Sequence, residues 1–106
     1  MSVGIIAGNV RSLSVVPFTF DPTSIGTYTV SELTVTCMGA KTTDMVFVNK
    51  PTTDAGLGVV NARVSAADTL AIALVNPTAA AIDAGSETWN ALVVRPESGT
   101  LSKVTD

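Results

Sequence analysis

Residues 57–95 read LGVVNARVSAADTLAIALVNPTAAAIDAGSETWNALVVR, and this stretch decides the fold. Apolar and polar residues alternate along three runs within it, at residues 59–65, 69–76 and 88–95. The runs are rich in Val, Ile, Leu and Thr, and Asp, Asn, Pro and Gly stand between them. Alternation of this kind, bounded by turn residues, is typical of antiparallel strands.

Shorter runs upstream extend the same pattern, at residues 13–20, 28–37 and 44–49. Pro17 lacks a backbone donor, so the first of these runs is expected at a sheet edge or at a bulge. No stretch has a helical period long enough for a stable helix. We therefore predict an all-β fold, a small antiparallel β-sandwich of about six to seven strands. A sandwich is favoured over a barrel because each run has one clean apolar face.

The alternation also predicts which side chains form the core. Within each run, the apolar residues of one phase point to one face of the sheet, and a slip of one residue would turn them all to solvent. The residues of the predicted core are Leu33, Val35, Val46, Val48, Val64, Leu70, Ile72, Leu74, Trp89 and Val93.

The ends of the chain differ from its middle, which suggests an N-terminal arm at residues 1–12, a sandwich domain at 13–96 and a C-terminal tail at 97–106. The arm carries Val3, Ile5, Ile6 and Val10, and burying one such side chain is worth roughly 1.5–3 kcal/mol. We predict that the arm makes the main docking contact or exchanges between subunits. The alternative is an ordinary frayed terminus.

Composition narrows the classes of partner. The chain is 46% hydrophobic, which excludes intrinsic disorder, and only 14% charged, which suits a surface that is covered by others. A net charge of −3 with scattered basic residues argues against nucleic acid. No apolar run is long enough to span a bilayer or to serve as a signal peptide, so we expect no membrane partner and a chain that is intracellular when made.

The residue types needed for chemistry are scarce. The chain has no His and a single Cys, so histidine-based catalysis and zinc sites built from His and Cys are not available. Cys37 is either a reactive thiol or, as we expect, a small buried residue at a strand end. The turn carboxylates leave calcium or a glycosidase pair open, but no spacing singles out a site. We predict a protein that is not an enzyme and needs no cofactor or metal.

Three further residues allow two interpretations each. Trp89 is either a core anchor, which we favour, or a platform on which a sugar ring stacks. Arg63 and Arg95 lie in strand runs flanked by apolar residues. They either protect a sheet edge or contact a partner, where Arg is enriched.

The order of runs DMVFVN (44–49), GLGVVNARVSAADT (56–69), LVNPT (74–78) and WNALVVR (89–95) resembles small β-sandwich virion proteins of tailed bacteriophages, of the capsid decoration (cement) kind. The resemblance covers roughly residues 34–95 and carries no catalytic signature. It implies a structural role on the outer capsid surface, bound to the major capsid protein, often as a symmetric oligomer. No functional residue is carried over by it.

The function expected on these grounds is that of a capsid decoration protein that stabilises the phage head. We expect self-association, with a trimer as the first guess because capsid junctions offer three-fold positions. The alternative is a phage fibre or adhesin-type module that binds carbohydrate. An exposed Trp89 beside carboxylates would favour this alternative, and a buried Trp89 would not.

Overall fold

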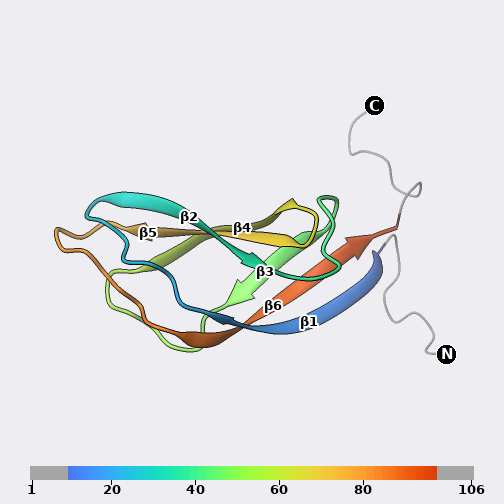
Figure 1. Cartoon of the computed structure of the whole chain (residues 1–106), viewed down its shortest axis with the longest axis horizontal. Helices are drawn as coiled ribbons and strands as arrows, with labels where there is room; N and C mark the ends of the chain where they lie inside the picture. The colour runs from blue at the N-terminus through green and yellow to red at the C-terminus, as the bar shows by residue number, and fades with distance from the viewer. Residues whose placement is uncertain (1–9, 98–106) are drawn as a thin grey trace.

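The computed structural model describes residues 10–97, which form six strands and no helix (Figure 1). This part of the chain therefore offers no helix that is long and apolar enough to cross a bilayer. The all-β prediction is confirmed. The strands are β1 (Val10–Phe20), β2 (Thr29–Thr36), β3 (Met45–Asn49), β4 (Gly58–Ala66), β5 (Thr69–Asn76) and β6 (Glu87–Pro96).

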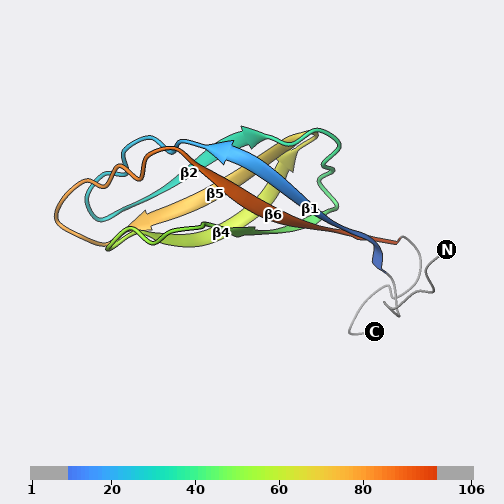
Figure 2. The same ribbon diagram turned by 90° about the horizontal axis from the view of Figure 1, so that it is seen from below.

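All six strands belong to one antiparallel sheet with the order β1-β6-β3-β4-β5-β2. The sheet turns back on itself between β3 and β4, where the register contains one pair, Met45↔Arg63. It thus forms two layers, β1-β6-β3 and β4-β5-β2, which face each other across the core (Figures 1 and 2). Residues of both layers share a buried cluster, for example Val46 and Val93 with Val64 and Leu70. The arrangement is a small sandwich whose layers are continuous through β3 and β4.

Trp89 is the centre of the core. It is fully buried, and the ring of Phe20 meets it edge-on at a centroid distance of 5.1 Å. Edge-to-face contacts of this kind add to the free energy of burial. The prediction that Trp89 is a core anchor is confirmed.

The other predicted core residues are also buried or half-buried. Those that are half-buried are Val48 and two residues of β2, which is an edge strand and has a neighbour on one side only in the sheet of residues 10–97. The predicted positions that are buried are Val46, Val64, Leu70, Ile72, Leu74, Trp89 and Val93, and those that are half-buried are Leu33, Val35 and Val48.

β1 is the other edge strand, as Pro17 predicted. It begins at Val10, three residues earlier than the strand expected from the sequence, because β6 continues to Pro96 and provides a pairing partner for Val10. The last residues assigned to the arm are therefore part of the sheet, with a bulge between Val10 and Ser12. Val3, Ile5, Ile6 and most of the predicted tail lie outside the described residues.

Asn76 is a buried polar residue that fixes the long β5–β6 connection. Its Nδ2 donates to the carbonyl oxygens of Ile25 and Ala80, at 3.0 and 2.8 Å, and its Oδ1 accepts hydrogen bonds from the backbone N–H and hydroxyl of Thr78. A buried amide stabilises a fold only when its hydrogen-bonding groups are satisfied, and here they are. The same connection pairs with the β1–β2 connection through the bridge Ile25↔Ile82.

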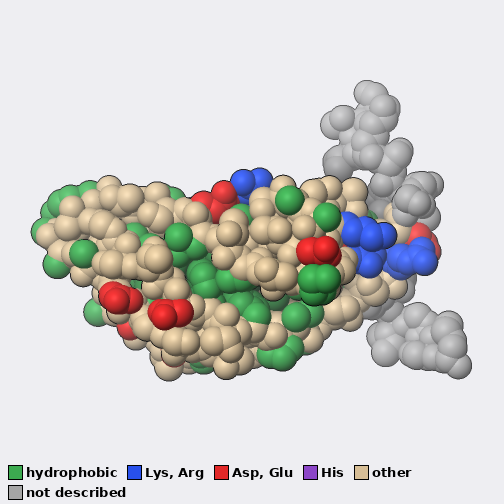
Figure 3. Space-filling model, in the orientation of Figure 1, with side chains coloured by type: hydrophobic (Ala, Val, Ile, Leu, Met, Phe, Trp, Pro, Cys, Tyr) green, Lys and Arg blue, Asp and Glu red, His purple; other side chains and the backbone are tan. Residues whose placement is uncertain are grey.

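Figure 3 shows hydrophobic side chains gathered along the middle of the face that is seen in Figure 1. Lys and Arg side chains lie at the end where β1 begins. Apolar side chains thus reach solvent along this side of the molecule, between the two layers.

Candidate binding surface

The outward-facing side of the β1-β6-β3 layer is apolar. Leu13, Val94 and Met45 pair across the three strands and form one row of side chains. Val15, Leu92 and Phe47 form a second row, two residues along each strand. Because neighbouring side chains in a strand point to opposite faces, both rows stand on the side away from Trp89. We call this surface the apolar outer face; it consists of Leu13, Val15, Met45, Phe47, Leu92 and Val94.

Five of these six side chains are exposed, and Val94 is half-buried. Val15 is 70% exposed, Phe47 56% and Met45 54%. None of the residues of the apolar outer face is charged. A contiguous apolar patch of several hundred Å² is typical of a surface that binds another protein or a ligand.

The outer face of the other layer has a different character. Arg63 on β4 donates two hydrogen bonds of 2.8 Å to the carboxylate of Glu32 on β2, and the pair reaches across β5, the strand between them. The outward side chains of β5 beneath it are Ala71 and Ala73, which are buried. The hydrogen bond from Arg63 lowers the pKa of Glu32, and the same contact raises the pKa of Arg63.

Arg63 and Arg95 do not protect a sheet edge, so that interpretation is wrong. β4 lies between β3 and β5, and β6 lies between β1 and β3. β6 pairs along both of its sides, β4 pairs with β5 along one side and with β3 at Met45↔Arg63, and each arginine forms an ion pair. The alternative, that they contact a partner, stays a prediction, and the structure does not bring the two residues together with one another.

Arg95 fastens the loop before β3 to β6. Its Nε and Nη2 donate to the two carboxylate oxygens of Asp44, at 2.9 and 2.7 Å, and Nη2 also donates to the carbonyl oxygen of Gly39. The Asp44 side chain is 0% exposed and also accepts a hydrogen bond from the backbone N–H of Lys41. These contacts, that of Arg95 first, hold the pKa of Asp44 below its usual value despite burial.

Cys37 lies directly after β2 and is buried, as expected of a structural residue. Burial raises the pKa of its thiol, and the carboxylates of Asp44 and Asp68 raise it further. A thiol with a raised pKa is a poor nucleophile because the reactive species is the thiolate. A hollow of about 200 Å³ beside it is lined by Ser12, Ser14, Val16, Cys37, Met38, Gly39, Ala40, Val93 and Arg95.

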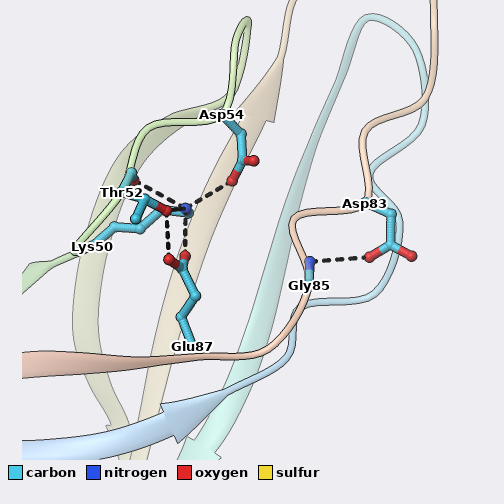
Figure 4. Close-up of polar contacts among 6 residues, drawn as sticks. All are labelled: Lys50, Thr52, Asp54, Asp83, Gly85 and Glu87. Carbon is cyan, nitrogen blue, oxygen red and sulfur yellow. Dashed lines mark hydrogen bonds and ion pairs between the residues drawn. The ribbon is translucent and has the colours of Figure 1, made fainter.

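A second polar cluster surrounds Lys50 at the start of the β3–β4 connection (Figure 4). Its ammonium lies 2.6 Å from Glu87 Oε1 and 2.7 Å from Asp54 Oδ2, and it donates to the carbonyl and hydroxyl oxygens of Thr52. The Thr52 hydroxyl in turn donates to the other carboxylate oxygen of Glu87. The cluster ties the connection to the first residue of β6.

The charge state of Lys50 suits this structural role. Burial alone lowers the pKa of Lys50, but its hydrogen bonds and charge interactions with Asp54 and Glu87 outweigh that effect, and the pKa is raised. Lys50 is therefore a firmly protonated cation. A lysine that acts as a nucleophile needs the opposite shift, because its neutral amine must be populated.

Neither a metal centre nor a sugar platform emerges from these groups. The described part of the chain has no set of three or more His, Cys, Asp and Glu residues that could hold a metal ion. Trp89 is buried in the core and cannot stack on a ligand at the surface. Tyr28 is 72% exposed, but a binding strip is usually built from more than one aromatic ring.

The apolar outer face was not predicted, although the sequence carries a signal for it. Residues 45–48 and 91–94 are unbroken apolar runs inside otherwise alternating strands. An unbroken run is typical of a strand whose two faces are both covered. Comparison of the chain with family models, curated proteins and solved structures found no match. Its function is therefore inferred from its own residues.

Proposed function

We propose that this chain is a non-enzymatic structural protein of a bacteriophage virion, a capsid decoration (cement) protein that binds the major capsid protein and stabilises the head. The observation that supports the proposal best is the apolar outer face. Its six side chains are uncharged, and the exposed ones include Val15, Met45 and Phe47. This is the kind of surface that a larger assembly covers.

The physical mechanism is burial of apolar surface across the boundary between capsid subunits. Each aliphatic or aromatic side chain that becomes buried contributes roughly 1.5–3 kcal/mol, minus the cost of ordering the contact. A ligand that binds only the assembled shell stabilises that shell by mass action. On this proposal the chain acts on the outer capsid surface and is made in the host cytoplasm.

Self-association is part of the proposal, with a trimer as the first arrangement to test. The sheet of residues 10–97 leaves β1 and β2 as unpaired edges, and unpaired edges favour association unless they are protected. Homo-oligomers are mostly symmetric, and a three-fold oligomer matches the three-fold positions of a capsid. The partners proposed are thus the major capsid protein and further copies of this chain, without nucleic acid or membrane.

The alternative, a fibre or adhesin-type module that binds carbohydrate, has less support. It relied on Trp89 as a stacking platform, and Trp89 is fully buried. The six side chains of the apolar outer face carry no charged or amide group, although the amides of Asn49 and Asn90 lie in the next row of the same side of the sheet, so these six side chains offer little for hydroxyl groups to bind. The decoration role is therefore preferred.

The proposal is tested by asking whether the chain travels with intact heads. Heads from a lysate in which the chain is made are banded on a density gradient, and the band is analysed by mass spectrometry. We expect the chain in the head band, in a fixed ratio to the major capsid protein, and we expect heads without it to break at lower temperature. Recovery of the chain only among the free proteins of the lysate would refute the role.

A further inference from the structure

β3 and β4 are neighbours in the sheet, yet they separate from one another. β3 pairs with β6 along its whole length, and β4 pairs with β5 along most of its length, but they pair with each other at Met45↔Arg63. Beyond that pair a hollow of about 310 Å³ lies between them. We call it the β3–β4 groove, and it is lined by Val46, Phe47, Val48, Val59, Val60, Asn61 and Ala62.

The chemistry of the groove specifies its ligand. The sides of β3 and β4 that face it carry backbone groups without a ladder partner among residues 10–97. Backbone donors and acceptors at the edge of a strand are best satisfied by another extended backbone. The lining side chains are aliphatic or aromatic apart from Asn61, and none is charged. The groove therefore suits an extended, uncharged and apolar peptide.

One segment of this chain has these properties. Residues 2–9 read SVGIIAGN, with no charged side chain and with aliphatic residues at Val3, Ile5 and Ile6. Val3, Ile5 and Ala7 alternate with other residues, which is the spacing of a strand that presents one apolar face. We propose that residues 2–9 of a second copy of this chain lie in the β3–β4 groove as an extended segment that pairs with its backbone.

The position of Val10 favours a second copy over the same chain. Val10 pairs with Pro96 at one end of the sheet, whereas Val48 in the groove pairs with Ala91, five positions further along β6. To reach the groove of its own sheet, the segment would have to reverse and cross β6 and β3, a path of roughly 20 Å at strand spacings. Residues 2–9 span at most about 30 Å when extended. Too few residues would remain to fill the groove, and a neighbouring copy has no such constraint.

This inference rests on the self-association in the proposed function but not on the capsid. If the chain associates by another surface, the proposed function survives and the groove contact fails. If the chain never binds heads but the groove contact is found, the reverse holds. Head-to-tail donation from one copy to the next also closes into a ring when the rotation between copies allows it.

The test uses two full-length variants that damage opposite sides of the contact. Ile5→Pro removes a backbone donor from the segment, and Val60→Glu places a charge in the groove, where Val60 is already 56% exposed and tolerates a polar replacement. Each variant alone should associate at least about tenfold more weakly than the unchanged chain, a loss of about 1.4 kcal/mol. Mass is measured by light scattering over a dilution series, and circular dichroism checks that both variants keep the β fold.

Mixing the two variants gives the decisive result. Ile5→Pro keeps an intact groove and Val60→Glu keeps an intact segment, so the mixture should form one-to-one heterodimers at concentrations at which each weakened variant alone is monomeric. In those heterodimers, hydrogen exchange should slow at the amides of residues 46–48 and 59–62 of the Ile5→Pro chain. The control Thr34→Lys, on the exposed outer face of the β4-β5-β2 layer and outside the groove, should associate like the unchanged chain.

Three outcomes would overturn the inference. The first is an unchanged chain that is monomeric at every concentration, which includes the case of a groove filled by its own chain. The second is association that survives both Ile5→Pro and Val60→Glu. The third is a mixture of the two variants that fails to recover association although each is folded.

Discussion

The outer faces of the two layers differ, although Val30 on β2 is 58% exposed on the side that carries the ion pair. On β4-β5-β2, the Arg63–Glu32 ion pair reaches over the small alanines of β5, and Thr34 stands beside it. On β1-β6-β3, the corresponding positions are filled by the apolar outer face, with Val15 and Phe47 among its most exposed members. Both layers contribute to one core, so the difference concerns only their surroundings.

The difference indicates which outer face is suited to contact with water and which is suited to contact with a partner. Charged and hydroxyl groups remain hydrated on the β4-β5-β2 side at little cost in free energy. Leaving valine, methionine and phenylalanine exposed on the other side costs free energy that burial by a partner would recover. The same contrast extends to the ion pairs, because Asp44–Arg95 in the apolar layer is far more buried than Glu32–Arg63 in the polar one.

The largest effect should follow from removing a core side chain that packs between the two layers. Trp89→Ala removes the fully buried ring that packs on Phe20 and leaves a cavity, which we expect to lower the free energy of unfolding by about 3–5 kcal/mol. Leu92→Ala, on the same strand but on the apolar outer face, should cost only about 1 kcal/mol or less. Urea unfolding followed by circular dichroism measures both. Equal losses for the two variants would contradict the assignment of inner and outer faces.

The buried ion pair of the apolar layer should matter next. Asp44→Asn keeps the size of the side chain but leaves the Arg95 guanidinium without its carboxylate, so we expect a loss of about 1–3 kcal/mol. Its matched control is Asp83→Asn, because the Asp83 carboxylate is exposed and accepts a weak local hydrogen bond from the backbone N–H of Gly85 (Figure 4). That control should leave the free energy of unfolding unchanged in the same urea experiment.

Acid should reproduce part of this loss. The pKa of Asp44 in the folded protein lies below its usual value of 3.8, mainly because Arg95 hydrogen-bonds to it. A lowered folded pKa means that the stabilisation is present above the unfolded pKa and is lost as the pH falls through the folded one. Thermal unfolding between pH 6 and about pH 2 should therefore show a falling Tm below about pH 4. The Tm of Asp44→Asn should fall less steeply with pH. An unchanged slope would show that other carboxylates cause the loss of stability in acid.

The apolar outer face itself should contribute to binding and not to folding. Val15→Lys should leave the free energy of unfolding within about 0.5 kcal/mol, because the side chain is already 70% exposed. On the proposed function, the same change should weaken attachment to heads at least about tenfold. Thr34→Lys, on the outer face of the other layer, is the matched control and should bind normally. Sedimentation of heads with labelled protein compares the two.

The exposed ion pair of the polar layer should have the smallest effect. Glu32→Gln removes a carboxylate whose partner, the Arg63 side chain, is 54% exposed, and exposed pairs contribute little because water and salt screen them. We expect Glu32→Gln to lower the Tm much less than Asp44→Asn does. The fall should disappear in 1 M salt, where the Debye length is about 3 Å. A persistent fall at high salt would mean that Glu32 acts by packing on β5.

Local pattern was sufficient to predict most of the fold. Alternation placed Leu70, Ile72 and Leu74 in the core because side chains in a strand point alternately to opposite faces, whatever the strand pairs with. The missing backbone donor of Pro17 likewise predicted an edge strand. Alternation did not give the start of β1, because Val10 joins the sheet only where β6 provides a partner at Pro96.

The binding surfaces could not be predicted from the sequence, because they depend on tertiary structure. Asp44 and Arg95 are 51 positions apart and Glu32 and Arg63 are 31 apart, so no local pattern could pair them. Leu13, Leu92 and Met45 form one surface only because β1, β6 and β3 are neighbours in the sheet, an order that does not follow the sequence. The sequence by itself determined which way each side chain points, since that is a property of one strand. Tertiary structure decided which side chains stand together, because that depends on the pairing of strands that are distant in the chain.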